Sequence, residues 1–143
     1  ASHIGLNPET GRQMNAGEME VELVPQGTLS ERIRSAGAGL GGVLTPTGIG
    51  TEVQKGKQVI TIDGKDYLLE KPLKGDVALI YGSKVDKAGN ISFVGTTRNT
   101  NIVMATAADV VIVEAEEFVD GYLNPNEVVI PGLFIDYIVK QKD

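Results

Sequence analysis

Apolar and polar positions change their spacing along the chain, and these changes predict a protein rich in strands. Two uninterrupted apolar runs, 77–81 (VALIY) and 110–113 (VVIV), are typical of buried strands that need cover on both faces. Residues 19–23 alternate apolar side chains with glutamate, which predicts a half-buried strand. The apolar segments 59–62 and 67–69 flank an Asp-Gly step, which predicts a hairpin. Weaker patterns predict strands at 91–94, 128–130 and 133–139, and a short helix at 101–108.

The strongest helix signal covers residues 28–36. Thr28-Leu29-Ser30-Glu31 has the form of a capping box, and Leu29, Ile33 and Ala36 share one helical face. Gly37 is expected to end the helix in a left-handed conformation. At the start of the chain, Asn7-Pro8 and Thr10-Gly11 are typical of turns.

Length and composition are those of an ordinary globular protein. With 143 residues, of which 41% are hydrophobic, the chain is expected to form one domain over residues 1–143. Its few helices and many strands predict an α/β fold, rich in β structure, around an open, mostly parallel or mixed sheet.

Charge and cysteine content exclude several classes of function. The net charge of −6 argues against binding to nucleic acid or to an anionic membrane surface. No apolar run approaches the ~20 residues that a membrane helix needs. The absence of cysteine excludes disulfides and thiolate metal sites, and it is compatible with the cytoplasmic location that we expect. Glu114, Glu116 and Glu117 lack a histidine or a further acid at ligand spacing, so no metal site is predicted.

The segment 25–51 holds six glycines between Gly37 and Gly50, and two readings of them stay open. The loop either brings backbone close to a ligand or forms a tight surface turn. Residues 37–42 match G-x-G-x-x-G, but they follow a helix instead of opening one, which argues against a dinucleotide site. Residues 50–57 fail the spacing of a phosphate loop, and the single histidine, His3, argues against a Ser-His catalytic pair.

Gln26 is a candidate ligand-binding side chain. It lies between Pro25 and Gly27 at a strand-to-helix junction, where ligands often bind in α/β folds. The alternative is a turn residue that faces water.

Motifs along the whole chain resemble the A (alpha) subunit of class I coenzyme A transferases, closest to the acetate/butyrate–acetoacetate type. The resemblance rests on colinear segments that include Ser2-His3-Ile4-Gly5, Pro25-Gln26-Gly27-Thr28-Leu29, Thr45-Pro46-Thr47-Gly48, Ala88-Gly89-Asn90 and Pro131-Gly132. The chain corresponds to the C-terminal two thirds of such a subunit, without the family's N-terminal Gly-Gly-Phe signature. It also departs from the family at Thr100-Asn101-Ile102, where an aromatic residue and a proline are usual.

The resemblance implies transfer of CoA between a short-chain acyl-CoA or 3-oxoacyl-CoA and an acid such as acetate, through a glutamyl-CoA thioester. The family's nucleophilic glutamate precedes Asn-Gly on the B (beta) subunit, and none of the eleven glutamates here does so. By resemblance, this chain is the non-nucleophile subunit, and the fragment alone is expected to be inactive. It would use a CoA thioester as substrate, with no permanently bound cofactor.

The resemblance also assigns site residues. Gln26 would donate to the oxyanion, and the acyl-CoA would be bound by Gly27, Gly39, Gly41, Gly42, Thr45 and Gly48. Two alternatives stay open: a non-catalytic binding or structural domain of the same fold, and an acyl-CoA thioesterase. The sequence does not identify the preferred acid.

Overall fold

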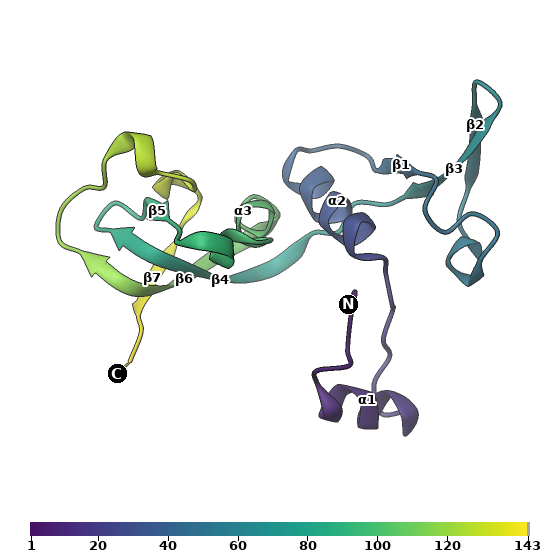
Figure 1. Cartoon of the computed structure of the whole chain (residues 1–143), viewed down its shortest axis with the longest axis horizontal. Coiled ribbons are helices and arrows are strands. Elements are labelled where there is room, and N and C mark those ends of the chain that lie inside the picture. Colours follow the sequence, from purple (N-terminus) through teal and green to yellow (C-terminus); the bar gives the residue numbers. More distant parts are fainter. Residues whose placement is uncertain (143) are drawn as a thin grey trace.

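A computed structural model describes residues 1–142 and shows two sheets on either side of a central helix (Figure 1). The helices are α1 (Pro8–Asn15), α2 (Gln26–Gly37) and α3 (Asn101–Met104). The strands are β1 (Val43–Thr45), β2 (Val59–Ile62), β3 (Lys65–Glu70), β4 (Gly75–Asp86), β5 (Ile91–Ser92), β6 (Ala108–Val119) and β7 (Tyr137–Lys140). Four short 3₁₀ turns are η1 (Glu52–Gln54), η2 (Gly95–Arg98), η3 (Pro125–Glu127) and η4 (Gly132–Phe134).

The larger sheet is mixed, in the order β5-β4-β6-β7, which confirms the predicted fold class. β4, β6 and β7 run parallel, and β5 runs antiparallel to β4. The two apolar runs form the adjacent strands β4 and β6, with Val77 opposite Val110. The main core lies on one face of this sheet, where Ile80, Val111 and Val113 pack with Ile91 and Ile130.

The expectation that both apolar runs are covered on both faces is wrong for residues 1–142. Ala78 and Ile80 are buried, but Val77 is 53% exposed and Leu79 is 70% exposed. On the same sheet, Tyr137 and Val139 of β7 are also exposed. The side chains of β4 therefore alternate between a covered face and an open face.

The smaller sheet has the order β1-β3-β2 and contains the predicted hairpin. β2 pairs antiparallel with β3, with Ile62 opposite Lys65. Asp63 and Gly64 both have positive φ angles, 51° and 75°, which gives a two-residue turn of type I′. β1 was not expected; it pairs with the other edge of β3 and places Val43 opposite Glu70.

The helix prediction is correct in place but wrong at both ends. α2 begins two residues before Thr28, with Pro25 as its N-cap, and Thr28 lies buried within the first turn. Thr28 is already helical, so it does not cap the helix. At the other end Gly39, not Gly37, has the left-handed conformation (φ +68°), and Leu40 N–H donates to Ser35 O over 2.9 Å.

Gly37 has a packing role instead. A Cβ atom at this position would lie 2.2 Å from Thr106 Oγ1 and 2.8 Å from the Thr106 carbonyl oxygen. Only glycine lets the end of α2 approach the turn after α3 this closely.

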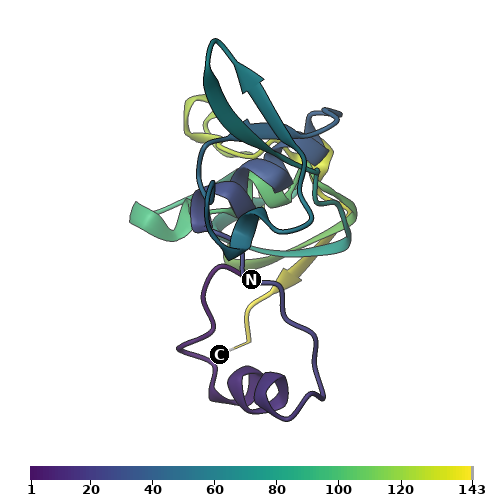
Figure 2. The same cartoon turned by 90° about the vertical axis from the view of Figure 1, so that its right-hand side faces the viewer.

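The N-terminal segment also differs from its prediction. Asn7-Pro8 opens helix α1 instead of a turn: the Asn7 side chain accepts from Thr10 N–H over 3.1 Å, and Pro8 is the first helical residue. α1 lies apart from both sheets (Figures 1 and 2). The strand expected at 19–23 does not form. Within residues 1–142, the backbone of residues 19–24 pairs only with Ala1, through Ala1 N to Glu22 O and Val24 N to Ala1 O, both 2.8 Å.

Four further elements are shorter than predicted. β5 ends at Ser92, α3 ends at Met104, Ile130 makes an isolated bridge to Ile91, and the last strand covers only residues 137–140. Within residues 1–142, no helix has both the length and the apolar character needed to cross a bilayer.

A buried carboxylate joins three loops at the end of the larger sheet. Asp86 is fully buried, and its carboxylate accepts from the N–H groups of Ala88, Asn90 and Leu123 and from Asn90 Nδ2, over 2.9 to 3.0 Å. Asn90 Oδ1 in turn accepts from Gly132 N–H over 2.9 Å. Burial raises the pKa of Asp86, but the four hydrogen bonds outweigh it and hold this pKa below its ordinary value.

Candidate functional site

A hollow of about 270 Å³ lies between the first turn of α2 and strand β1. The helix contributes Gly27, Thr28 and Glu31, and the strand side contributes Val43, Leu44, Thr45 and Thr47. Two of the residues predicted from the sequence, Gly27 and Thr45, therefore line one cavity although they are far apart in the chain.

The start of α2 presents backbone donors to this hollow. Pro25 caps the helix without a side-chain hydrogen bond, and the first backbone bond of the helix runs from Leu29 N–H to Pro25 O over 2.9 Å. The N–H groups that precede it carry the positive end of the helix dipole. A Cβ atom at Gly27 would meet no heavy atom within 4 Å, so the backbone here is open to a ligand. This arrangement suits a negatively charged oxygen.

Gln26 is the first residue of α2, and its side chain is exposed. Its Oε1 accepts a hydrogen bond from Ser2 Oγ. No hydrogen bond from Gln26 Nε2 is found within residues 1–142, so the donor end of the amide is free to bind a ligand oxygen.

Glu31 brings a carboxylate into the hollow, but this carboxylate is paired. Arg34 donates to Glu31 Oε2 from Nε over 2.8 Å and from Nη2 over 2.6 Å. These hydrogen bonds lower the pKa of Glu31, which therefore stays ionised. The Arg34 guanidinium offsets the negative charge that would otherwise repel an anionic ligand.

The other predicted glycines do not line this hollow. Gly39 and Gly41 lie in the loop after the other end of α2, and that end is about 16 Å from Gln26 by the rise of an α-helix. Gly42 and Gly48 serve close packing: a Cβ atom would lie 2.6 Å from Glu70 O in one case and 2.7 Å from Val53 Cγ1 in the other. Their role in ligand binding stays a prediction.

The β1 wall of the hollow is fixed by an ion pair in the smaller sheet. Glu70, opposite Val43, has a side chain that is only 2% exposed, and its Oε1 lies 2.6 Å from Lys57 Nζ. Lys57 follows the turn at η1, so the pair joins that loop to β3.

Glu70→Gln is expected to destabilise the complete subunit by about 1–3 kcal/mol, because Lys57 loses its counter-charge in a partly buried position. Urea unfolding measures this change. Glu52→Gln is the matched control, since Glu52 pairs with Lys55 on the open surface and is expected to contribute at most about 0.5 kcal/mol. Equal effects of the two substitutions would contradict a role for the buried pair.

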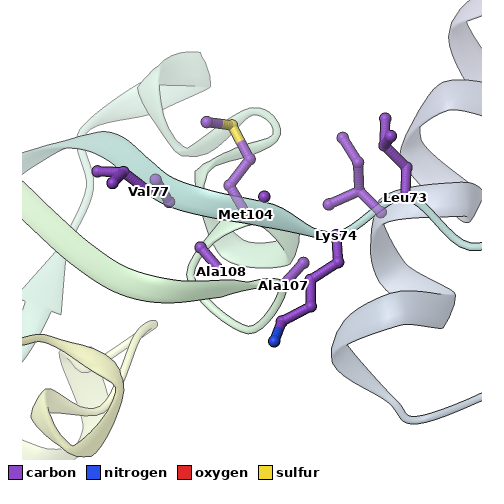
Figure 3. Close-up of a pocket in the computed structure, with 9 residues that line it drawn as sticks. Leu73, Lys74, Val77, Met104, Ala107 and Ala108 are labelled. Atoms are coloured by element: carbon purple, nitrogen blue, oxygen red, sulfur yellow. The ribbon is translucent and has the colours of Figure 1, made fainter.

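A second hollow, of about 300 Å³, lies between α2 and the larger sheet (Figure 3). Its lining is mostly apolar, with Leu73, Val77, Met104, Ala107 and Ala108 among the contributors. Lys74 extends away from Met104 and bonds to Asp109. None of the predicted site residues lies here, and the lining offers few polar groups to orient a substrate.

Sequence reasoning missed Ser2 as a contact of Gln26 and missed the Lys57–Glu70 pair. Ser2 and Gln26 are 24 positions apart, and no periodic pattern connects them. The capping pattern directed attention to Thr28 instead.

Comparison with known proteins matches the chain to one protein family. The model of the family described as Coenzyme A transferase matches residues 1–141. Acetate CoA-transferase subunit alpha of Escherichia coli K12 is 55% identical over 100% of this chain and 66% of that protein. Acetoacetyl-CoA:acetate/butyrate CoA transferase alpha subunit of Clostridium acetobutylicum is 58% identical over 99% of this chain and 65% of that protein. The chain thus spans slightly less than two thirds of the length of these two relatives.

Solved structures have the same fold. An acyl-CoA transferase of Escherichia coli O157:H7, in a thioester complex with CoA, matches 98% of this chain and 33% of that chain, with a TM-score of 0.84 and 25% identity. Glutaconate coenzyme A-transferase of Acidaminococcus fermentans matches 92% of this chain and 49% of that chain, with a TM-score of 0.81 and 21% identity, a likeness of fold alone.

Proposed function

The chain belongs to the coenzyme A transferase family, and from that premise we propose that the complete protein transfers CoA between a short-chain acyl-CoA or 3-oxoacyl-CoA and a carboxylic acid such as acetate. The observation that carries the proposal is the identity of 55% and 58%, over essentially the whole chain, to alpha subunits named for acetate and acetoacetyl-CoA transfer. The enzyme would act in the cytoplasm.

The proposed chemistry is a carboxylate relay. A glutamate of the beta subunit attacks the thioester carbonyl, and the CoA thiolate leaves to give an acyl-glutamyl anhydride. The thiolate then attacks the glutamyl carbonyl, which releases the first acid and leaves glutamyl-CoA. The second acid repeats these steps in reverse, so each difficult exchange is divided into easier ones.

The residues of this chain would stabilise the oxyanion that forms at each addition. Gln26 Nε2 is the proposed side-chain donor, and the start of α2 adds the positive end of its dipole. Gly27 would let the carbonyl approach the backbone, and Thr45 would contact the acyl group from the opposite wall. The glycines at 39, 41, 42 and 48 are proposed to line the path of the longer CoA arm.

The complete alpha subunit alone is expected to show no exchange of CoA between acetoacetyl-CoA and acetate, because the nucleophile is proposed to lie on the beta subunit. Adding the beta subunit should restore exchange, measured as acetate-dependent formation of acetyl-CoA. Robust exchange without the beta subunit would refute this division of roles. Acetate-independent release of free CoA would indicate a thioesterase, and inactivity of the combined subunits would indicate a binding domain.

A further inference from the structure

We propose that Ser2 is a positioning residue that orients the side-chain amide of Gln26 for catalysis. The inference rests on the proposed function, in which Gln26 Nε2 donates to the oxyanion. Ser2 Oγ donates to Gln26 Oε1, at the end of the amide opposite to that donor.

The backbone around Ser2 is held in place, so its hydroxyl has a defined position. Ala1 N donates to Glu22 O, and Val24 N donates to Ala1 O, each over 2.8 Å. Val24 is only 4% exposed, which anchors this junction to the interior. The two segments that carry Ser2 and Gln26 are thus hydrogen-bonded to each other close to both residues.

The orientation of the side-chain amide decides whether Gln26 stabilises or destabilises the oxyanion. A glutamine side chain ends in an acceptor oxygen and a donor nitrogen, which exchange places on rotation of the last torsion. With the oxygen toward the reacting carbonyl, Gln26 would repel the developing negative charge. A hydroxyl that donates to Oε1 selects the productive orientation before substrate arrives, and such preorganisation lowers the barrier.

The test uses the complete alpha–beta enzyme and compares Ser2→Ala, Ser2→Thr, Gln26→Ala and the double variant Ser2→Ala/Gln26→Ala. Ser2→Ala is expected to lower kcat by roughly tenfold with little change in KM, because the amide spends less time in the reactive orientation. Ser2→Thr retains the hydroxyl and should recover most of the loss. In the Gln26→Ala background, Ser2→Ala should have almost no further effect.

A merely structural role for Ser2 gives a different pattern. The loss would then be similar with and without Gln26, or KM and thermal stability would change while kcat did not. Either result overturns the inference, as does an unchanged kcat in Ser2→Ala while Gln26→Ala is impaired. If the unsubstituted alpha–beta enzyme shows no CoA exchange, the proposed function itself fails, which is a separate outcome.

Discussion

Gln26→Ala in the proposed alpha–beta enzyme is expected to lower kcat by roughly 100-fold or more, the usual effect of removing one oxyanion donor, which is the role that we propose for Gln26. KM should change far less, since the hydrogen bond strengthens mainly in the transition state. The physical basis is the free Nε2 donor at the start of α2, beside a hollow that Gly27 leaves open. Steady-state kinetics with acetoacetyl-CoA and acetate measure both constants.

Folding should survive this substitution, because an exposed side chain at the first helical position usually contributes within about 0.5 kcal/mol. Gln58→Ala is the matched control: Gln58 is also an exposed glutamine, and it precedes β2, away from the start of α2. If the Gln26→Ala enzyme has a normal kcat and only a lower thermal midpoint, Gln26 has a structural role and does not act in catalysis.

The sequence predicts those elements whose signal is local. The Asp63-Gly64 hairpin and the apolar runs of β4 and β6 are recognisable because turn chemistry and apolar runs lie within a few residues. The alternation at 19–23 is equally local but misleads, because a strand also needs a neighbouring strand, and in the part of the chain that the structure describes the backbone of this segment pairs only with Ala1. Asn7-Pro8 misleads for another reason: the same dipeptide serves in turns and at helix starts.

The candidate site depends on contacts between segments that are far apart in the chain, and local sequence patterns do not predict such contacts. Thr45 faces the start of α2 because β1 pairs with β3, a partner more than 20 residues further along the chain. The same pairing places Val43 next to Glu70, whose charge is then matched by Lys57. Gln26 is a candidate from its position before the predicted helix, and family motifs assign the roles of Gln26 and Gly27, whereas their surroundings come from the tertiary structure.

Asp86→Ala is expected to destabilise the complete subunit by about 3 kcal/mol or more, the largest effect on stability that we predict. The substitution leaves the N–H groups of Ala88, Asn90 and Leu123 without their acceptor in a buried place, and each buried unpaired group costs about 1–3 kcal/mol. Urea unfolding, followed by circular dichroism, measures the loss. Asp109→Ala is the control, since the exposed side chain of Asp109 bonds, among the described residues, only to exposed Lys74, and its effect is expected to stay below about 1 kcal/mol.

The same carboxylate should make stability depend on pH in acid. The pKa of Asp86 is lower in the folded protein than its ordinary value of 3.8, so the folded state prefers the ionised form. The stabilisation is complete above a pH of about 4 and is lost as pH falls through the folded pKa, because the unfolded chain binds the proton first. Asp86→Asn, which does not titrate, should therefore show a shallower loss of unfolding free energy as the pH falls below about 4 than the unsubstituted subunit. Parallel curves for the two proteins would mean that other carboxylates govern the acid transition and that the hydrogen bonds to Asp86 do not stabilise its charge.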